Sequence, residues 1–163
     1  MMFLFLAATL LSIANAGYDE VKKDMSWVYT EKWDDADSYL TTGSSLRYKM
    51  LPPRRRTKHQ AEINKGETVK VMYKLYIGHG TPDYKHIYSQ STLSEAFSLT
   101  VGGGSVIKGF DEAVLLMKDG DRGRFLMPSK IAYGAGGAAG FGIPPNTELE
   151  YFLEIHKTGS GEL

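Results

Sequence analysis

Apolar and polar residues alternate along several short stretches of the chain, the pattern of strands with one dry and one wet face. The clearest stretch spans residues 69–77, where every second residue is apolar and Lys70 and Lys74 are among the residues between. The same alternation recurs in residues 46–50, 97–101, 125–127 and 149–155. Turn-forming residues separate these stretches, so we predict an antiparallel sheet of about five strands with one solvated face.

One stretch has helical spacing instead. In residues 106–117, Phe110, Ala113, Val114 and Met117 recur three and four positions apart, which places them on one face of a helix. Acidic residues fall in its first turn, where the positive end of the helix dipole stabilises negative charge. We therefore predict an α+β domain in which one short helix covers the dry face of a twisted antiparallel sheet.

Two long segments between the predicted strands are candidates for a functional role. Residues 78–95 are polar and rich in serine and tyrosine, and residues 133–146 contain five glycines. Loops of this length in a compact domain are commonly functional. We expect both segments to lack regular secondary structure.

The first sixteen residues have the pattern of a secretory signal peptide. Residues 1–16 are uncharged, largely apolar, and end in Ala14-Asn15-Ala16, the small-x-small pattern of a cleavage site. They are too short for a stable membrane span, which needs about 20 residues. We predict that they are cleaved and that the protein enters the secretory pathway, in the endoplasmic reticulum lumen or secreted. A hydrophobic N-terminal anchor is the alternative.

Three further regions follow this predicted signal. Residues 17–44 are polar and aromatic with weak helical spacing, and we expect an N-terminal extension, possible helices included, that packs on the domain edge. A partner-binding arm is the alternative. A turn leads into a single domain of residues 45–157, and residues 158–163 form a C-terminal tail.

Charge and composition exclude several classes of function. Nineteen basic and nineteen acidic residues cancel, so no overall field favours nucleic acid or an anionic membrane. The chain has no cysteine. His79 and His86 lack a third ligand at metal-site spacing, and the glycines of residues 134–139 are followed by prolines rather than by a dinucleotide-binding helix. We expect neither a metal nor a cofactor, and no covalent nucleophile.

Four segments of the predicted domain occur in an order that one family shares. They read Val-Ile-Lys-Gly-Phe-Asp-Glu-Ala, Gly-Asp-Arg, Pro-Ser-Lys-Ile-Ala-Tyr-Gly and Ile-Pro-Pro-Asn. In these segments the chain resembles the FKBP-type peptidyl-prolyl cis-trans isomerases. The resemblance covers residues 45–157 and implies the FKBP-like fold, a sheet wrapped over one short helix. It also implies isomerisation of X-Pro bonds in proline-containing polypeptides, which assists protein folding.

The resemblance also implies a proline pocket between the helix start and the sheet. Phe110 would be its floor against the pyrrolidine ring, where tryptophan is usual in the family. Ile107 would hold a substrate carbonyl with its backbone N–H, and Tyr133 would donate its hydroxyl to the carbonyl of the isomerising bond. The other implied substrate-binding residues are Tyr73, Ile87, Tyr88, Phe97, Val106, Ile143 and Tyr151.

The chain departs from the family pattern beside this pocket. Tyr88 stands where the family has an aspartate and Leu93 where it usually has an arginine, and about four extra residues lie between Tyr73 and Ile87. We therefore expect reduced activity and reduced affinity for the family's macrolide inhibitors. The alternative function is a weakly active or inactive FKBP domain that serves as a protein-binding or chaperone module.

Overall fold

The computed structural model describes residues 25–31, 33, 38–51, 60–90, 92 and 94–158. The predicted signal peptide, Leu93 and the tail beyond Thr158 lie outside the described residues. No helix in these described ranges is long and apolar enough to cross a membrane.

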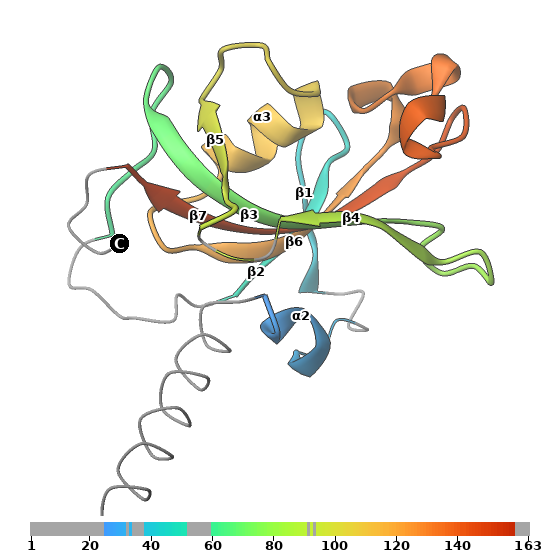
Figure 1. Ribbon diagram of the computed structural model, residues 1–163, viewed down its shortest axis with the longest axis horizontal. Coiled ribbons are helices and arrows are strands. Elements are labelled where there is room, and N and C mark those ends of the chain that lie inside the picture. The colour runs from blue at the N-terminus through green and yellow to red at the C-terminus, as the bar shows by residue number, and fades with distance from the viewer. Residues whose placement is uncertain are drawn as a thin grey trace, which may run out of the picture.

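One antiparallel sheet forms the body of the domain (Figure 1). Neighbouring strands follow the order β1-β2-β6-β7-β3-β4, and β5 pairs with the start of β3. The five predicted strands are present, so the prediction of an α+β fold with an antiparallel sheet is confirmed. The strands are β1 (Leu40–Thr41), β2 (Arg47–Leu51), β3 (Thr68–Ile77), β4 (Lys85–Gln90), β5 (Phe97–Thr100), β6 (Arg122–Met127) and β7 (Leu149–Lys157).

Strands β1 and β4 lie where no strand was predicted. β4 lies within residues 78–95, so the prediction that this segment is all loop was wrong. It pairs antiparallel with β3, with a register shift between Leu75 and Tyr76. As an edge strand it buries few side chains, and its backbone bonds with β3 need no apolar alternation in the sequence. The periodicity that revealed the other strands was therefore absent here.

The helix α3 (Lys108–Leu115) lies over one face of the sheet, which we call the front face (Figure 1). It is shorter than the predicted range of residues 106–117 and begins after Ile107, whose backbone is extended. Phe110, Ala113 and Val114 are buried in one apolar core with the front-face side chains of β3 and β7. Apolar burial of this kind fixes the helix on the sheet.

The opposite face, the back face, is covered in part by the N-terminal extension. A short helix, α2 (Trp27–Thr30), lies beneath the sheet (Figure 1). The prediction of a solvated face was therefore wrong in this area, because residues far apart in the sequence pack together there. We call these residues the back cluster: Met25, Trp27, Val28, Trp33, Met72, Tyr76 and Phe152.

Three charged residues that alternation assigned to the wet face are buried at this site. Glu150 is 1% exposed, and Arg124 and Glu154 are each 4% exposed. Arg124 forms an ion pair with Glu150, and the indole N–H of Trp27 donates to Glu154 Oε2 at 2.8 Å. Because buried charges require such partners, the extension and the back face form one polar as well as apolar interface.

Candidate functional site

A pocket of about 360 Å³ opens at the N-terminal end of α3, between the helix and the front face. We call it the aromatic pocket, since most of its larger side chains are rings. Strands β3, β5 and β7, the loop before α3 and residue 133 all contribute to it. Its lining residues are Tyr73, Phe97, Gly104, Ser105, Val106, Ile107, Phe110, Tyr133 and Tyr151.

Three rings form a fixed base for this pocket. Phe110, in the first turn of α3, is 4% exposed. Its ring lies nearly perpendicular to those of Tyr73 and Tyr151, with centroids 6.1 Å and 5.3 Å away. Tyr73 and Tyr151 come from the paired strands β3 and β7, and their own centroids are 5.9 Å apart. Edge-to-face contacts at these distances are favourable, so the rings hold one another in place.

Two hydrogen-bond donors of the pocket remain unused among the described residues. The carbonyl of Ile107 accepts from the N–H groups of Phe110 and Asp111 at 3.0 and 3.2 Å, but the N–H of Ile107 itself donates to no described residue. The hydroxyl of Tyr133, which is half-buried, likewise has no described partner. Both groups are therefore free to donate to a carbonyl oxygen in the pocket.

The walls of the pocket carry no formal charge. Burial raises the pKa of Tyr73 to about 12, helped by the neighbouring Tyr88 and Tyr133. Burial also raises the pKa of Tyr151, again with Tyr133 and Tyr73 nearby. No acidic or basic side chain is among the described lining residues. Such a site suits an apolar ring bound beside a polar amide, with hydrogen bonds to the amide carbonyl.

The glycine-rich segment of residues 133–146 is a folded flap rather than an open loop. It contains two short 3-10 turns, Gly134–Gly136 and Ala139–Phe141. The N–H of Asn146 donates to the carbonyl of Gly134 at 2.8 Å, and so closes the flap at its base beside Tyr133. At Gly137, φ is +63° and an added Cβ would lie 2.6 Å from the carbonyl oxygen of Ile143, so glycine is required there.

Three predicted substrate-binding residues do not line the pocket. Ile143 is buried in the front core, and Ile87 is half-buried against the same core. Tyr88 is 48% exposed on β4, with its ring centroid 5.9 Å from that of Tyr73. Their predicted contact with substrate stays a prediction. Leu93, which stands where the family usually has an arginine, lies outside the described residues.

The structure brings the other predicted residues together, with two that the sequence did not indicate. Tyr133, Phe110 and Ile107 share the pocket with the remaining predicted wall residues. Gly104 and Ser105 complete the lining. Small residues carry no chemical signal of their own, and only their place directly before Val106 connects them with the site.

Comparison with known sequences assigns this domain to a family. The family model of FKBP-type peptidyl-prolyl cis-trans isomerase matches residues 59–156. The peptidyl-prolyl cis-trans isomerase FKBP12 of Vicia faba is 37% identical over 92 residues, which cover 56% of this chain and 82% of that protein. The FK506-binding protein of Neisseria meningitidis serogroup B is 35% identical over 96 residues, covering 59% and 84%.

Solved structures show the same fold. FkpA from Escherichia coli aligns with a TM-score of 0.61 and 26% identity over 95% of this chain and 68% of that chain. AtFKBP13 aligns with a TM-score of 0.61 and 24% identity over 74% of this chain and 98% of that chain. The chain belongs to the FKBP-type peptidyl-prolyl cis-trans isomerase family, and its enzyme class is peptidyl-prolyl isomerase.

Proposed function

We propose that the aromatic pocket binds an X-Pro bond of a polypeptide and catalyses its rotation. The observation that carries this proposal is the combination of an uncharged aromatic base with two unused donors, Tyr133 and the Ile107 N–H. The base suits a pyrrolidine ring over Phe110. The donors suit the carbonyl oxygens on the acyl side of the bond.

The proposed mechanism needs no nucleophile. Rotation about an amide faces a barrier of about 18–20 kcal/mol because amide resonance must be broken. A pocket with little water favours the twisted amide, which is less polar than the planar form that water solvates. Phe110 fixes the proline side while the acyl side turns, and Tyr133 donates to its carbonyl. Only contacts that strengthen in the twisted state accelerate the reaction.

Polypeptides of the secretory pathway are the proposed substrates. The support is the apolar, uncharged segment of residues 1–16 with its small-x-small end at Ala14-Asn15-Ala16. Cleavage there starts the mature protein at Gly17, in the endoplasmic reticulum lumen or outside the cell. A fusion of residues 1–20 to a reporter enzyme tests this: export with a Gly17 N-terminus supports it. Export unaffected by Leu11→Arg contradicts it.

One observation favours a second candidate function, a weakly active domain that binds proteins as a chaperone module. Tyr88, rather than a carboxylate, lies beside Tyr73. Tyr88 supplies no charged acceptor that would orient the hydroxyl group of Tyr73. We propose reduced catalytic strength and reduced macrolide affinity for the same reason.

A tetrapeptide with one X-Pro bond, in a protease-coupled assay, separates the two candidates. Tyr133→Phe should lower kcat/KM about fivefold, because a hydrogen bond contributes about 1 kcal/mol and about 1.4 kcal/mol is a factor of ten. Tyr48→Phe is the matched control, since Tyr48 stacks on Phe125 of β6 and lies outside the pocket lining. If the wild-type protein gives no isomerisation rate above background, the isomerase function is excluded and the binding-module function remains.

A further inference from the structure

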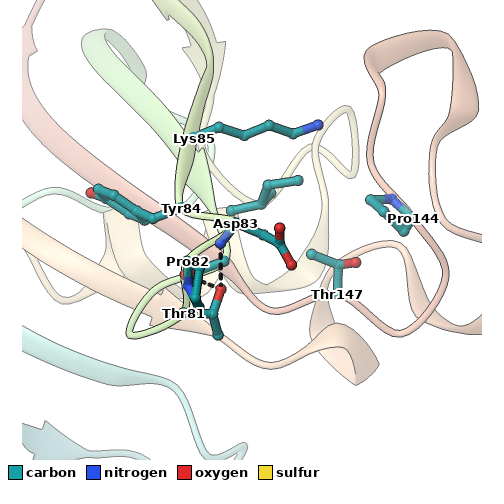
Figure 2. Close-up of a pocket in the computed structure, with 9 residues that line it drawn as sticks. Thr81, Pro82, Asp83, Tyr84, Lys85, Pro144 and Thr147 are labelled. Atoms are coloured by element: carbon teal, nitrogen blue, oxygen red, sulfur yellow. Dashed lines mark hydrogen bonds between the residues drawn. The ribbon is translucent and has the colours of Figure 1, made fainter.

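A second hollow, of about 520 Å³, lies on the front face between the β3–β4 hairpin and the segment that leads into β7 (Figure 2). We call it the hairpin groove. Thr81, Asp83 and Lys85 line it from the hairpin, and Pro144 and Thr147 line it from the other side. The hairpin turn lies between Tyr73 and Ile87, the stretch in which we predict about four residues more than the family pattern has, so we expect the groove to be particular to this chain.

The hairpin wall is held in one shape by its own hydrogen bonds. The N–H and hydroxyl of Thr81 both donate to the carbonyl of Gly78, at 3.0 and 2.8 Å. The N–H of Asp83 donates back to the Thr81 hydroxyl oxygen at 3.2 Å, as the dashed lines in Figure 2 show. Gly78 has φ of +76°, and a Cβ there would lie 2.7 Å from the Asp83 carbonyl oxygen. A wall formed before binding reduces the entropy cost of holding a ligand.

Contacts with the back face hold the hairpin in place on the sheet. The ring of Tyr84 stacks on that of Tyr76 with centroids 5.2 Å apart. His79 packs edge-on against Tyr84, and its Nδ1 lies 2.7 Å from Nη2 of the buried Arg124. The hairpin is therefore fixed to the end of the sheet and does not depend on a ligand for its position.

Two opposite charges, those of Asp83 and Lys85, line the groove. Figure 2 shows the Asp83 carboxylate directed toward Thr147 and the Lys85 side chain extended toward Pro144. Both residues are exposed, and neither forms an ion pair within the part of the chain that the structure describes. Charged side chains of a ligand would meet one attractive and one repulsive group here, so charge would influence how it binds.

The groove lies within reach of the aromatic pocket along the same strands. Tyr73 lines the pocket and Ile77 lines the groove, four positions apart on the same face of β3, which is about 13 Å at about 3.3 Å per residue. Edge strand β4 connects the same two places, from Tyr88 beside Tyr73 to Lys85 at the groove. An extended polypeptide covers this distance with about four residues.

We propose that the hairpin groove is a second subsite for the polypeptide substrate, holding charged residues about four positions from the isomerising proline. This inference rests on the proposed isomerase function. A tetrapeptide occupies only the aromatic pocket, whereas a long chain occupies both sites. Long substrates are therefore turned over with a preference set by Asp83 and Lys85.

The test compares an X-Pro tetrapeptide with twelve-residue peptides that carry two glutamates or two lysines about four positions before or after the proline. Lys85→Glu should lower kcat/KM about fivefold or more for the glutamate peptide in one of these placements and raise it for the lysine peptide. Asp83→Lys should do the reverse. The tetrapeptide rate should stay within a factor of two in both variants.

Lys65→Glu, a matched charge reversal in the turn before β3, is the control. An equal effect of Lys65→Glu, or equal effects on the tetrapeptide and the long peptides, overturns the subsite. If the wild type fails to turn over the tetrapeptide, the isomerase proposal fails separately. Fluorescence anisotropy of the labelled long peptides then decides on the subsite, because the opposite responses of the two variants are also expected in Kd.

Discussion

Within the described residues, both faces of the sheet carry a group of aromatic rings, and the front group lines the aromatic pocket. Strands β3 and β7 supply both groups, because successive side chains of a strand point to opposite faces. Tyr73 and Tyr151 face the front, whereas Tyr76 and Phe152 face the back. The aromatic character of a strand therefore does not decide whether its rings form a site or a core.

What differs is the chain segment that meets each group. On the back face, Trp27 and Trp33 fill the space over Phe152, with ring centroids 6.1 and 5.3 Å from it. On the front face, the small residues Gly104 and Ser105 are part of the lining of an open volume of about 360 Å³. Small side chains add little bulk to the pocket, whereas the extension contributes two indoles to the back core.

The largest expected effect comes from opening the back face. Trp27→Ala should lower the free energy of unfolding by about 3–5 kcal/mol, the usual cost of truncating a buried large aromatic residue. It also leaves the buried Glu154 carboxylate without its indole donor. Urea unfolding followed by circular dichroism measures this change.

Leu40→Ala is the control for that measurement, since Leu40 is 62% exposed and its truncation should change stability by less than about 0.5 kcal/mol. The tetrapeptide rate of the folded Trp27→Ala protein should equal that of the wild type, because no back-cluster residue lines the aromatic pocket. A stability loss below about 1 kcal/mol would show that the extension is not part of the domain core.

A smaller effect is expected from changing Tyr88, which lies beside the front-pocket residue Tyr73. Tyr88→Asp places a carboxylate beside Tyr73, where it can accept a hydrogen bond and orient the pocket's hydroxyl groups. We expect kcat/KM for the tetrapeptide to rise about threefold to tenfold, the equivalent of about 0.7–1.4 kcal/mol. Stability should change little, since Tyr88 is half exposed.

Tyr88→Asn is the control for this gain, because it has the size of aspartate without the charge. An equal rise in both variants would assign the gain to removal of the tyrosine ring. No rise in either would mean that the missing carboxylate does not limit activity, which would leave the proposed reduction in strength without its cause.

The sequence predicted the front face well and the back face poorly, for a physical reason. Alternation in β3 places Tyr73 on the apolar face of the strand, opposite to the face of its neighbours Met72 and Lys74. The burial of Met72 and Glu154 involves Trp27 and Trp33, which lie in a distant segment with only weak periodicity of its own. No local sequence pattern shows which back-face side chains are buried, because contacts between distant segments decide their burial.

In the functional site, too, the sequence predicted some features and not others. Family resemblance placed Phe110 and Tyr133 in the pocket, where the structure also has them. It placed Ile143 there as well, but that residue is buried in the core. Apolar side chains in a core and in a pocket wall have the same chemistry, so sequence alone does not separate them. The open volume follows from packing.

The smallest expected effect is a pH dependence that comes from the buried tyrosines of the front face. Burial raises the pKa of Tyr73 to about 12 from an ordinary value of 10.0. Below about pH 10 the hydroxyl is protonated in both the folded and the unfolded chain, so stability is fully present. Between about pH 10 and 12 the unfolded chain releases its proton first, and the free energy of unfolding falls. Urea unfolding at pH 8 and pH 11 should therefore show a smaller loss in Tyr73→Phe than in the wild type. An identical loss in both proteins would mean that the Tyr73 hydroxyl is as accessible to water in the folded pocket as in the unfolded chain, and that the front face is wetter than its ring contacts indicate.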